Sequence, residues 1–286
     1  MLSSTQKTIN CKISCNSIAL HSGVNVNMTL HPASVNTGII FVRSDVDSKI
    51  NKVSANYLNV TTTNLGTTIA NNHGITVSTI EHLMASIWGC GIDNLIIELD
   101  GPEVPIMDGS SEPFVFLIEC AGVKTSDEPK KFIEITKKFR YQEGDKFIEV
   151  EPSKFFELDI AIDFNNIHIT KNNLTYHASL NSFKNDICRA RTFCFENEIK
   201  TMHSLGLAKG GNLDNAIVIS DQGILNKSKL RYQDEFVKHK TLDFLGDIRL
   251  AENFIIGKFN TYKTGHSINN KFLRNFFNSK DHWVLI

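Results

Sequence analysis

The chain has 286 residues and a mass of 32.1 kDa, which suggests one large or two modest domains. Hydrophobic residues make up 41% of the chain and charged residues 21%, and this composition excludes an intrinsically disordered protein. Lys and Arg number 30 against 31 Asp and Glu, so the net charge of −1 argues against a protein that binds nucleic acid through phosphate contacts.

Short segments rich in β-branched and aromatic residues predict strands in both halves of the chain. They cover residues 26–30, 38–42 and 95–99, and then 147–151, 158–163, 215–219 and 253–259. Apolar residues at helical spacing predict helices over residues 78–89, 111–122 and 234–250. Strands interleaved with a few helices are typical of an α+β fold with a layer of sheet and a layer of helix in each half.

Short motifs recur in the same order in the two halves. Leu30-His-Pro-Ala33 corresponds to Val150-Glu-Pro-Ser153. Ile80-Glu-His82, Gly89 and Asn94-Leu-Ile-Ile97 correspond to Val237-Lys-His239, Gly246 and Asn253-Phe-Ile-Ile256. Four matches in one order predict two similar domains. The charged, Pro-containing segment 124–131 is the expected linker, so we predict domains over residues 1–126 and 127–286.

The helix predicted over residues 234–250 is largely apolar but carries one polar stripe. At about 100° per residue, its large apolar residues spread around most of the circumference, as in a buried helix. Four ionisable residues fall together within an arc of roughly 100°: His239, Lys240, Asp243 and Asp247. Each uncompensated buried charge costs several kcal/mol, so a buried stripe of this kind requires a functional or structural partner.

His239 and Asp243 are four residues apart, which makes their side chains neighbours on one face of the helix. An imidazole and a carboxylate so placed can hold one divalent metal ion. A solvated face with ion pairs is the more frequent origin of such a spacing, and both interpretations stay open on this pair alone.

Glu81-His82 resembles half of a zinc-peptidase helix, in which the His binds metal and the Glu handles the proton of a water molecule. Ser86 stands where that motif has its second His, so other ligands must come from elsewhere, and His239 with Asp243 would complete a set of three. Ser78-Thr-Ile-Glu81 also matches a capping box, and spacing alone favours the cap.

His266 follows Gly265, which predicts a turn that presents the ring to a cleft; a surface-loop His is the commoner alternative. If Asp247 faced His266, its carboxylate would orient the ring and favour the protonated form.

The cysteines and the apolar segments of the sequence indicate the cellular compartment of the protein. The six cysteines form no CxxC pair, which indicates reduced thiols. No apolar run approaches the roughly 20 residues that span a bilayer. We therefore expect a cytoplasmic protein without a transmembrane segment.

Taken together, these residues resemble the UDP-3-O-acyl-N-acetylglucosamine deacetylases of lipid A biosynthesis. The matching segments span nearly the whole chain in the family's order: Ala19-Leu-His-Ser-Gly23, Thr79-Ile-Glu-His-Leu83, Gly91-Ile-Asp-Asn94, Pro105-Ile-Met-Asp-Gly-Ser110, Arg189-Ala-Arg-Thr-Phe193, Gly210-Gly211, Phe236-Val-Lys-His-Lys-Thr-Leu-Asp243 and Gly265-His-Ser-Ile-Asn-Asn-Lys271. The resemblance implies two α+β domains of similar topology with the active site between them. It also implies removal of the N-acetyl group from a UDP-3-O-(3-hydroxyacyl)-N-acetylglucosamine, giving acetate and a free amine.

The resemblance further implies one zinc ion per chain on His82, His239 and Asp243, with an open fourth position for water. Ferrous iron would suit the same ligands in the cell. Glu81 is implied as the general base. His266, held protonated by Asp247, is implied as the group that protonates the leaving amine or stabilises the oxyanion, and the Thr192 hydroxyl as a second oxyanion donor.

The resemblance also implies which residues contact the substrate, because their positions match those of the family. Lys240 is one residue from the ligand His239 and is expected near the metal as a further catalytic residue. Lys240 and Lys263 are also expected to face the sugar or the diphosphate, and three residues to lie near the nucleotide: Lys146, Asp163 and Phe164. Three more are expected near the sugar and the acyl chain: Leu65, Phe193 and Gly211. We expect an apolar passage for the acyl chain around residues 190–195 and 202–207, a small-molecule substrate as the partner, and a monomer.

Two other classes of function fit parts of the pattern. Two His and one carboxylate also form the facial triad of non-haem iron oxygenases, although a Glu beside a ligand favours hydrolysis. A paired α+β module that binds RNA or protein is the non-enzymatic alternative. The near-neutral charge argues against RNA, and the buried polar stripe argues against a purely structural role.

Overall fold

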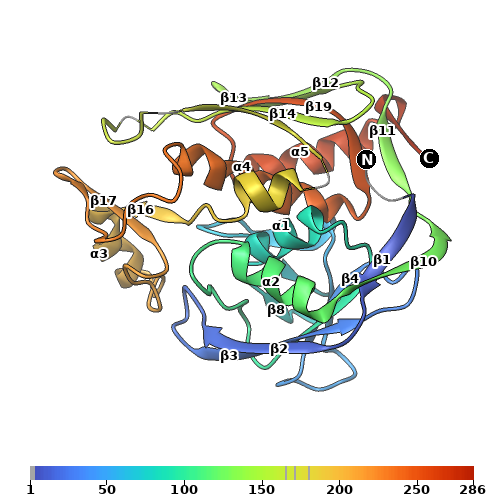
Figure 1. Ribbon diagram of the computed structural model, residues 1–286, viewed down its shortest axis with the longest axis horizontal. Helices are drawn as coiled ribbons and strands as arrows, with labels where there is room; N and C mark the ends of the chain where they lie inside the picture. Colours follow the sequence, from blue (N-terminus) through green and yellow to red (C-terminus); the bar gives the residue numbers. More distant parts are fainter. Residues whose placement is uncertain (1–3, 165, 171, 180) are drawn as a thin grey trace.

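The structure is a computed structural model, and it describes residues 4–164, 166–170, 172–179 and 181–286. Figure 1 shows two outer β-sheets with two layers of helices between them. One sheet contains, in order, β2 (Ile13–Ile18), β3 (Asn25–Pro32), β9 (Leu95–Leu99), β4 (Ile39–Arg43) and β5 (Lys52–Ser54). Helices α1 (Glu81–Gly89) and α2 (Glu112–Ala121) lie on its inner side.

The opposite sheet is built the same way from the second half of the chain. Its strands run in the order β12 (Phe139–Glu143), β13 (Lys146–Glu151), β19 (Phe254–Tyr262), β14 (Phe156–Ala161) and β15 (Asn173–His177). Helices α4 (Glu235–Ile248) and α5 (His266–Asn278) face inward from it. Strand β11 (Phe132–Ile135) pairs with β19, and β20 (Trp283–Leu285) pairs with β11.

The two halves match in strand orientation as well as in strand order. β3 is antiparallel to β9 and β4 is parallel to β9, just as β13 is antiparallel to β19 and β14 is parallel to β19. The repeated sequence motifs fall at equivalent places, since Pro32 ends β3 while Pro152 follows β13. This confirms the prediction of two similar α+β units.

Smaller elements complete the fold. β1 (Thr5–Ile9) pairs with β10 (Val123–Pro129), so the predicted domain boundary after residue 126 falls inside a strand and stays a prediction. β6 (Val60–Thr62), β7 (Thr68–Ala70) and β8 (Thr76–Val77) form a small sheet. β16 (Phe193–Phe195), β17 (Ile217–Ser220), β18 (Gly223–Ile224) and α3 (Glu196–Ser204) form a unit that projects at the left of Figure 1. Short helical turns span Tyr57–Asn59, Phe183–Ile187, Arg249–Ala251 and Lys280–His282.

Sequence patterns located the main elements, with shifts of a few residues at their ends. The predicted helix at residues 78–89 begins only at Glu81, because Thr79 has a φ of +56°, which a right-handed helix excludes. The helix predicted over residues 234–250 is α4, and it is buried throughout except for the half-buried Lys238 and Lys240. Helices α3 and α5 were not predicted.

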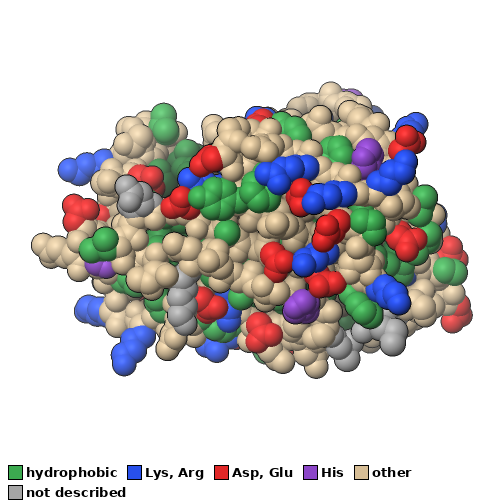
Figure 2. Space-filling view, turned by 90° about the horizontal axis from the view of Figure 1, so that it is seen from above, with side chains coloured by type: hydrophobic (Ala, Val, Ile, Leu, Met, Phe, Trp, Pro, Cys, Tyr) green, Lys and Arg blue, Asp and Glu red, His purple; other side chains and the backbone are tan. Residues whose placement is uncertain are grey.

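Charged side chains of both signs are interspersed over the outer face of the second sheet, which Figure 2 views from above. Lys138 lies 2.7 Å from Glu149, and Lys258 lies 3.3 Å from Asp159. Exposed pairs of this kind contribute about 0–1 kcal/mol each. This face is therefore an ordinary solvated surface. Among the described residues, no helix is both long enough and apolar enough to span a membrane.

Helices α1 and α4 pack directly against each other, and Gly246 is the point of closest approach. A Cβ atom added at Gly246 would lie 2.1 Å from the carbonyl oxygen of Glu81, which is far inside van der Waals contact. The helix backbones can therefore meet only because this residue has no side chain. Glu81 begins α1, so the contact also sets where that residue sits relative to α4.

Replacing Gly246 with Ala is expected to lower the free energy of unfolding by about 2 kcal/mol or more, because overpacking forces two backbones apart. The higher helix propensity of Ala offsets only about 1 kcal/mol of that loss. Thermal or urea unfolding measures the change. Gly265→Ala is the matched control, because a Cβ there meets no atom within 4 Å. Equal stability of both variants would contradict the close-approach argument.

Candidate active site

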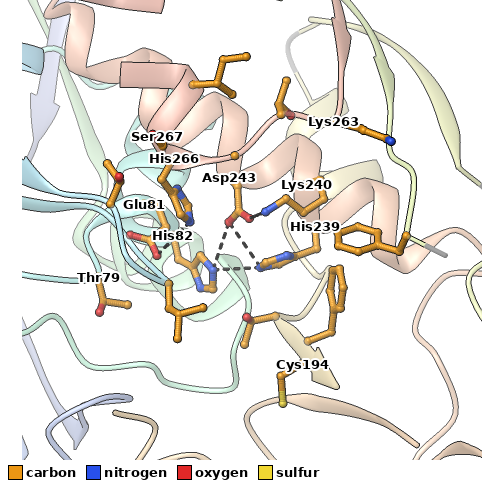
Figure 3. A pocket seen from close by; sticks show the side chains of 18 of the residues that line it. Thr79, Glu81, His82, Cys194, His239, Lys240, Asp243, Lys263, His266 and Ser267 are labelled. Atoms are coloured by element: carbon orange, nitrogen blue, oxygen red, sulfur yellow. Dashed lines mark hydrogen bonds and ion pairs between the residues drawn. The ribbon is translucent and has the colours of Figure 1, made fainter. Parts of the chain in front are cut away.

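Three side chains from two helices converge at the junction of the two halves (Figure 3). His82 comes from α1, while His239 and Asp243 come from α4. The two histidine Nε2 atoms are 3.1 Å apart, and they lie 3.6 Å and 3.5 Å from Asp243 Oδ1. Three ligand atoms that each lie about 2.0–2.1 Å from one ion have separations of this size. Within the described part of the chain, these three buried side chains form a group that could hold a metal ion.

Protonation at the cluster favours metal binding. Burial lowers the pKa of His239 to about 3, although the Asp243 carboxylate partly opposes this, so the imidazole is neutral and offers a lone pair. Burial alone would raise the pKa of Asp243, but His239 and Lys240 hold it well below its usual range. A neutral imidazole and a carboxylate are the forms that bind a divalent cation.

Asp243 Oδ1 also lacks a partner that would explain its burial. Within the described part of the chain it is buried and accepts no hydrogen bond, while Oδ2 receives the ammonium of Lys240 at 2.5 Å. A buried anionic oxygen without a donor is costly. Oδ1 faces both Nε2 atoms, so a cation bound among the three atoms would remove that cost. The residues present therefore fit a divalent metal ion.

Glu81 is the first residue of α1, and its carboxylate is not used as a helix cap. Oε2 accepts a hydrogen bond from the backbone N–H of Thr67 at 2.9 Å, and Oε1 lies 3.9 Å from His266 Nε2. The helix start has no side-chain cap, and Ser78 instead interacts with Thr68. The capping-box interpretation of residues 78–81 is therefore wrong. Glu81 is buried and directed toward the cavity that contains the three-residue cluster.

His266 is held by Asp247, as the sequence suggested. Its Nδ1 lies 2.8 Å from Asp247 Oδ2, and the ring lines the same cavity as Glu81 and His82. Burial disfavours the charged imidazole, but the carboxylates of Asp247, Glu81 and Asp243 outweigh it and raise the pKa of His266 to about 9. The expectation of a turn is wrong in one respect, because His266 begins helix α5 and Gly265 precedes it as the helix cap.

The cavity in front of these groups has a volume of about 460 Å³. Its lining includes most of the residues predicted for catalysis and substrate binding: Leu65, Glu81, His82, Lys146, Phe164, Thr192, Phe193, His239, Lys240, Asp243, Lys263 and His266. Asp163 does not line it; its carboxylate instead accepts hydrogen bonds from Lys263 at 3.0 Å and from the Tyr262 hydroxyl at 2.9 Å. Lys263 is also paired with Asp145 at 2.7 Å, so its ammonium is held at the cavity rim.

A second, more apolar cavity of about 330 Å³ adjoins the first. Thr192, Phe193, Cys194, Leu20 and Leu65 line both cavities, so the two lie side by side. Side chains from α3 and β17 form its walls, among them Ile199, Met202 and Val218, and Gly211 lies on its lining as well. This cavity occupies the region where the sequence predicted an apolar passage.

Sequence reasoning missed three polar residues that support the site. Asn269 donates to Asp247 Oδ2 at 2.7 Å, and Thr67 donates to Asp247 Oδ1 at 2.6 Å. The buried Glu103 carboxylate accepts hydrogen bonds from the backbone of His21 and Ser22 and from Thr79, beside Glu81. Asn269 lies one helical turn after His266 in α5. A correct prediction of this helix would therefore have placed the Asn269 side chain on the same face as His266. Nothing in the sequence indicates Thr67, because its partners are distant along the chain.

Sequence comparison with known proteins gives a family match over nearly the whole chain. A family model described as UDP-3-O-acyl N-acetylglycosamine deacetylase matches residues 6–278. The chain belongs to this family. The UDP-3-O-acyl-N-acetylglucosamine deacetylase of Tolumonas auensis is 44% identical over 284 residues, which cover 98% of this chain and 92% of the relative. The protein of the same name from Acidithiobacillus ferrooxidans is 45% identical over 284 residues, with the same coverage. The family resemblance drawn from the sequence motifs is confirmed.

Proposed function

We propose that the chain is a zinc-dependent deacetylase that removes the N-acetyl group from a UDP-3-O-(3-hydroxyacyl)-N-acetylglucosamine, the committed deacetylation of lipid A biosynthesis. The observation that carries the proposal is the placement of Glu81 and the His266–Asp247 pair around the His82, His239 and Asp243 cluster in one cavity. Membership in the deacetylase family supports the substrate class.

His82, His239 and Asp243 would hold the metal ion, leaving an open position toward the cavity. A zinc ion bound there would supply Lewis-acid activation of the amide carbonyl and of a water molecule. Three protein ligands with an open position are typical of catalytic zinc sites rather than structural ones. Ferrous iron would suit the same donor set.

Glu81 and His266 divide the proton transfers in this proposal. The Glu81 carboxylate accepts the proton of the attacking water. His266, protonated at neutral pH with its pKa raised to about 9, donates a proton to the leaving amine. The Thr192 side chain and Lys240 line the cavity beside the cluster and would stabilise the developing oxyanion. Acetate and a free glucosamine amine are the products.

Each of the two cavities would bind a different part of the substrate. Lys146, Phe164 and Lys263 line the polar cavity and would receive the sugar and the nucleotide, with Asp163 at the rim through its bond to Lys263. The apolar cavity next to Phe193 and Leu65, with Gly211 on its wall, would receive the acyl chain. The proposed site needs no residue from a second copy of the chain, and a monomer stays our expectation. The six free thiols support the cytoplasm as the working compartment.

The test is a direct assay of purified chain on UDP-3-O-(3-hydroxyacyl)-N-acetylglucosamine. We expect stoichiometric release of acetate and appearance of a primary amine on the sugar. UDP-N-acetylglucosamine without the acyl chain is the matched control substrate and should react far more slowly, because it leaves the apolar cavity empty. Turnover that requires oxygen and a keto acid would instead support the iron-oxygenase alternative.

The pH dependence of deacetylation should follow the protonation of His266. The rate is expected to fall as the pH rises through about 9, because the raised pKa keeps the imidazole protonated only below that value. Asp247 at 2.8 Å is the nearest carboxylate that raises this pKa. Asp247→Asn should therefore lower the maximal rate and move the alkaline limb of the pH–rate profile toward neutral pH. An alkaline limb that stays in place in the variant would contradict the assignment.

A further inference from the structure

Thr67 lies between the two carboxylates that flank the site and makes a hydrogen bond to each. It stands immediately before β7, on the first half of the chain. Its backbone N–H donates to Glu81 Oε2 at 2.9 Å, and its hydroxyl donates to Asp247 Oδ1 at 2.6 Å. Its carbonyl accepts from the N–H of Ile80, just before helix α1, at 3.3 Å. One residue thus contacts the expected base, the carboxylate behind the expected acid, and the start of the helix.

These contacts connect the two halves of the molecule. Glu81 begins α1, whereas Asp247 lies near the end of α4, 180 positions from Thr67 in sequence. All three residues are buried, with exposed fractions of 2% for Thr67 and Asp247 and 4% for Glu81. Buried hydrogen bonds to carboxylates are short and directional, so they fix relative positions well.

The two oxygens of Asp247 have separate partners. His266 Nδ1 and Asn269 Nδ2 contact Oδ2 at 2.8 Å and 2.7 Å. The Thr67 hydroxyl contacts Oδ1. Without a donor at Oδ1 the carboxylate could rotate, and the His266 ring bonded to its other oxygen would follow. The Thr67 hydroxyl therefore sets the angle at which Asp247 presents the imidazole to the cavity.

We propose that Thr67 is a positioning residue for deacetylation, which holds Asp247 and thereby His266 at a fixed distance from Glu81; this rests on the proposed function. A threonine suits the role because its β-branched side chain has few rotamers and its hydroxyl supplies the donor. The hydrogen bond from its backbone N–H to Glu81 does not involve the side chain. A side-chain substitution therefore tests only the hydrogen bond to Asp247.

Thr67→Val keeps the shape of the side chain and the backbone hydrogen bond to Glu81 but removes the hydroxyl. We expect kcat to fall by about 10- to 100-fold with KM nearly unchanged, because misplacing a catalytic group costs this much without affecting substrate binding. Thr67→Ser, which keeps the donor, should restore most of the rate. In an Asp247→Ala background, Thr67→Val should have little further effect, because the residue acts through Asp247. Steady-state kinetics and thermal unfolding of each variant give these values.

Thr68→Val is the matched control, because the neighbouring buried hydroxyl contacts Ser78 and neither carboxylate. It should retain the wild-type rate. An inactive wild type would refute the proposed function, whereas an active wild type with an equally active Thr67→Val would refute only the role of Thr67. A raised KM, or an undiminished effect in the Asp247→Ala background, would also overturn it. If Thr67→Val does not fold, Thr67→Cys, a weak donor of similar size, must show a reduced kcat for the inference to stand.

Discussion

Removing divalent metal from the purified chain is expected to abolish deacetylation, and stoichiometric zinc is expected to restore it. His82, His239 and Asp243 present three ligand atoms that lie between 3.1 Å and 3.6 Å from one another and can supply three ligands to one ion. A Lewis acid contributes several kcal/mol of transition-state stabilisation, which corresponds to a loss of about a thousandfold or more in rate. Acetate release before chelation, after chelation and after zinc addition measures the effect.

Elemental analysis separates loss of metal from loss of fold. The untreated chain should hold one metal ion, and His239→Ala should hold much less, because removing one of three protein ligands opens the site. His31→Ala is the matched control: this histidine lies on β3 and pairs with Glu98 at 3.1 Å, away from the cluster. It should keep both metal and activity. Full activity in metal-free protein would contradict the proposal that deacetylation depends on a bound metal ion.

Replacing Glu81 with Gln is expected to lower kcat by about 10²- to 10⁴-fold, because the amide cannot accept the proton of the attacking water. The substitution preserves the size of the side chain and an oxygen that can accept the Thr67 N–H. Glu81 is not one of the three ligand residues, so the variant should retain its metal. Steady-state kinetics together with metal analysis of the same sample test both statements.

Glu112→Gln is the control for this substitution. Glu112 also begins a helix, α2, but its carboxylate is at the surface, 3.4 Å from Arg189. Loss of that exposed pair should change neither rate nor metal content. A Glu81→Gln variant with nearly normal turnover would show that the buried carboxylate is structural, even though the helix start does not use it as a cap.

Local sequence patterns identified the central strands of the two main sheets and three of the helices, but not the edge strands or most strands of the smaller sheets. Apolar spacing identified α1, α2 and α4, and repeated motifs indicated that the halves share a topology, which the matching strand orders confirm. Helix α5 was missed although Ile268, Phe272 and Phe276 are buried at helical spacing. Gly265 before His266 favours a turn in the sequence, whereas in the structure it is the cap of this helix. Helix α1 begins later than predicted because Thr79 has a positive φ, and its hydroxyl donates to Glu103, a contact 24 residues away that no local pattern shows.

The sequence alone determined that His239, Lys240, Asp243 and Asp247 share one side of a helix, because helical geometry relates residues three or four apart without reference to the rest of the chain. Motif resemblance added His82 and Glu81 to that group. Only the tertiary structure decided how the two helices meet. The contact of Gly246 with the Glu81 backbone brings His82 within 3.1 Å of His239, 157 residues away. The tertiary structure also places Thr67 between Glu81 and Asp247. Such contacts arise from packing between distant segments, and no local pattern encodes them.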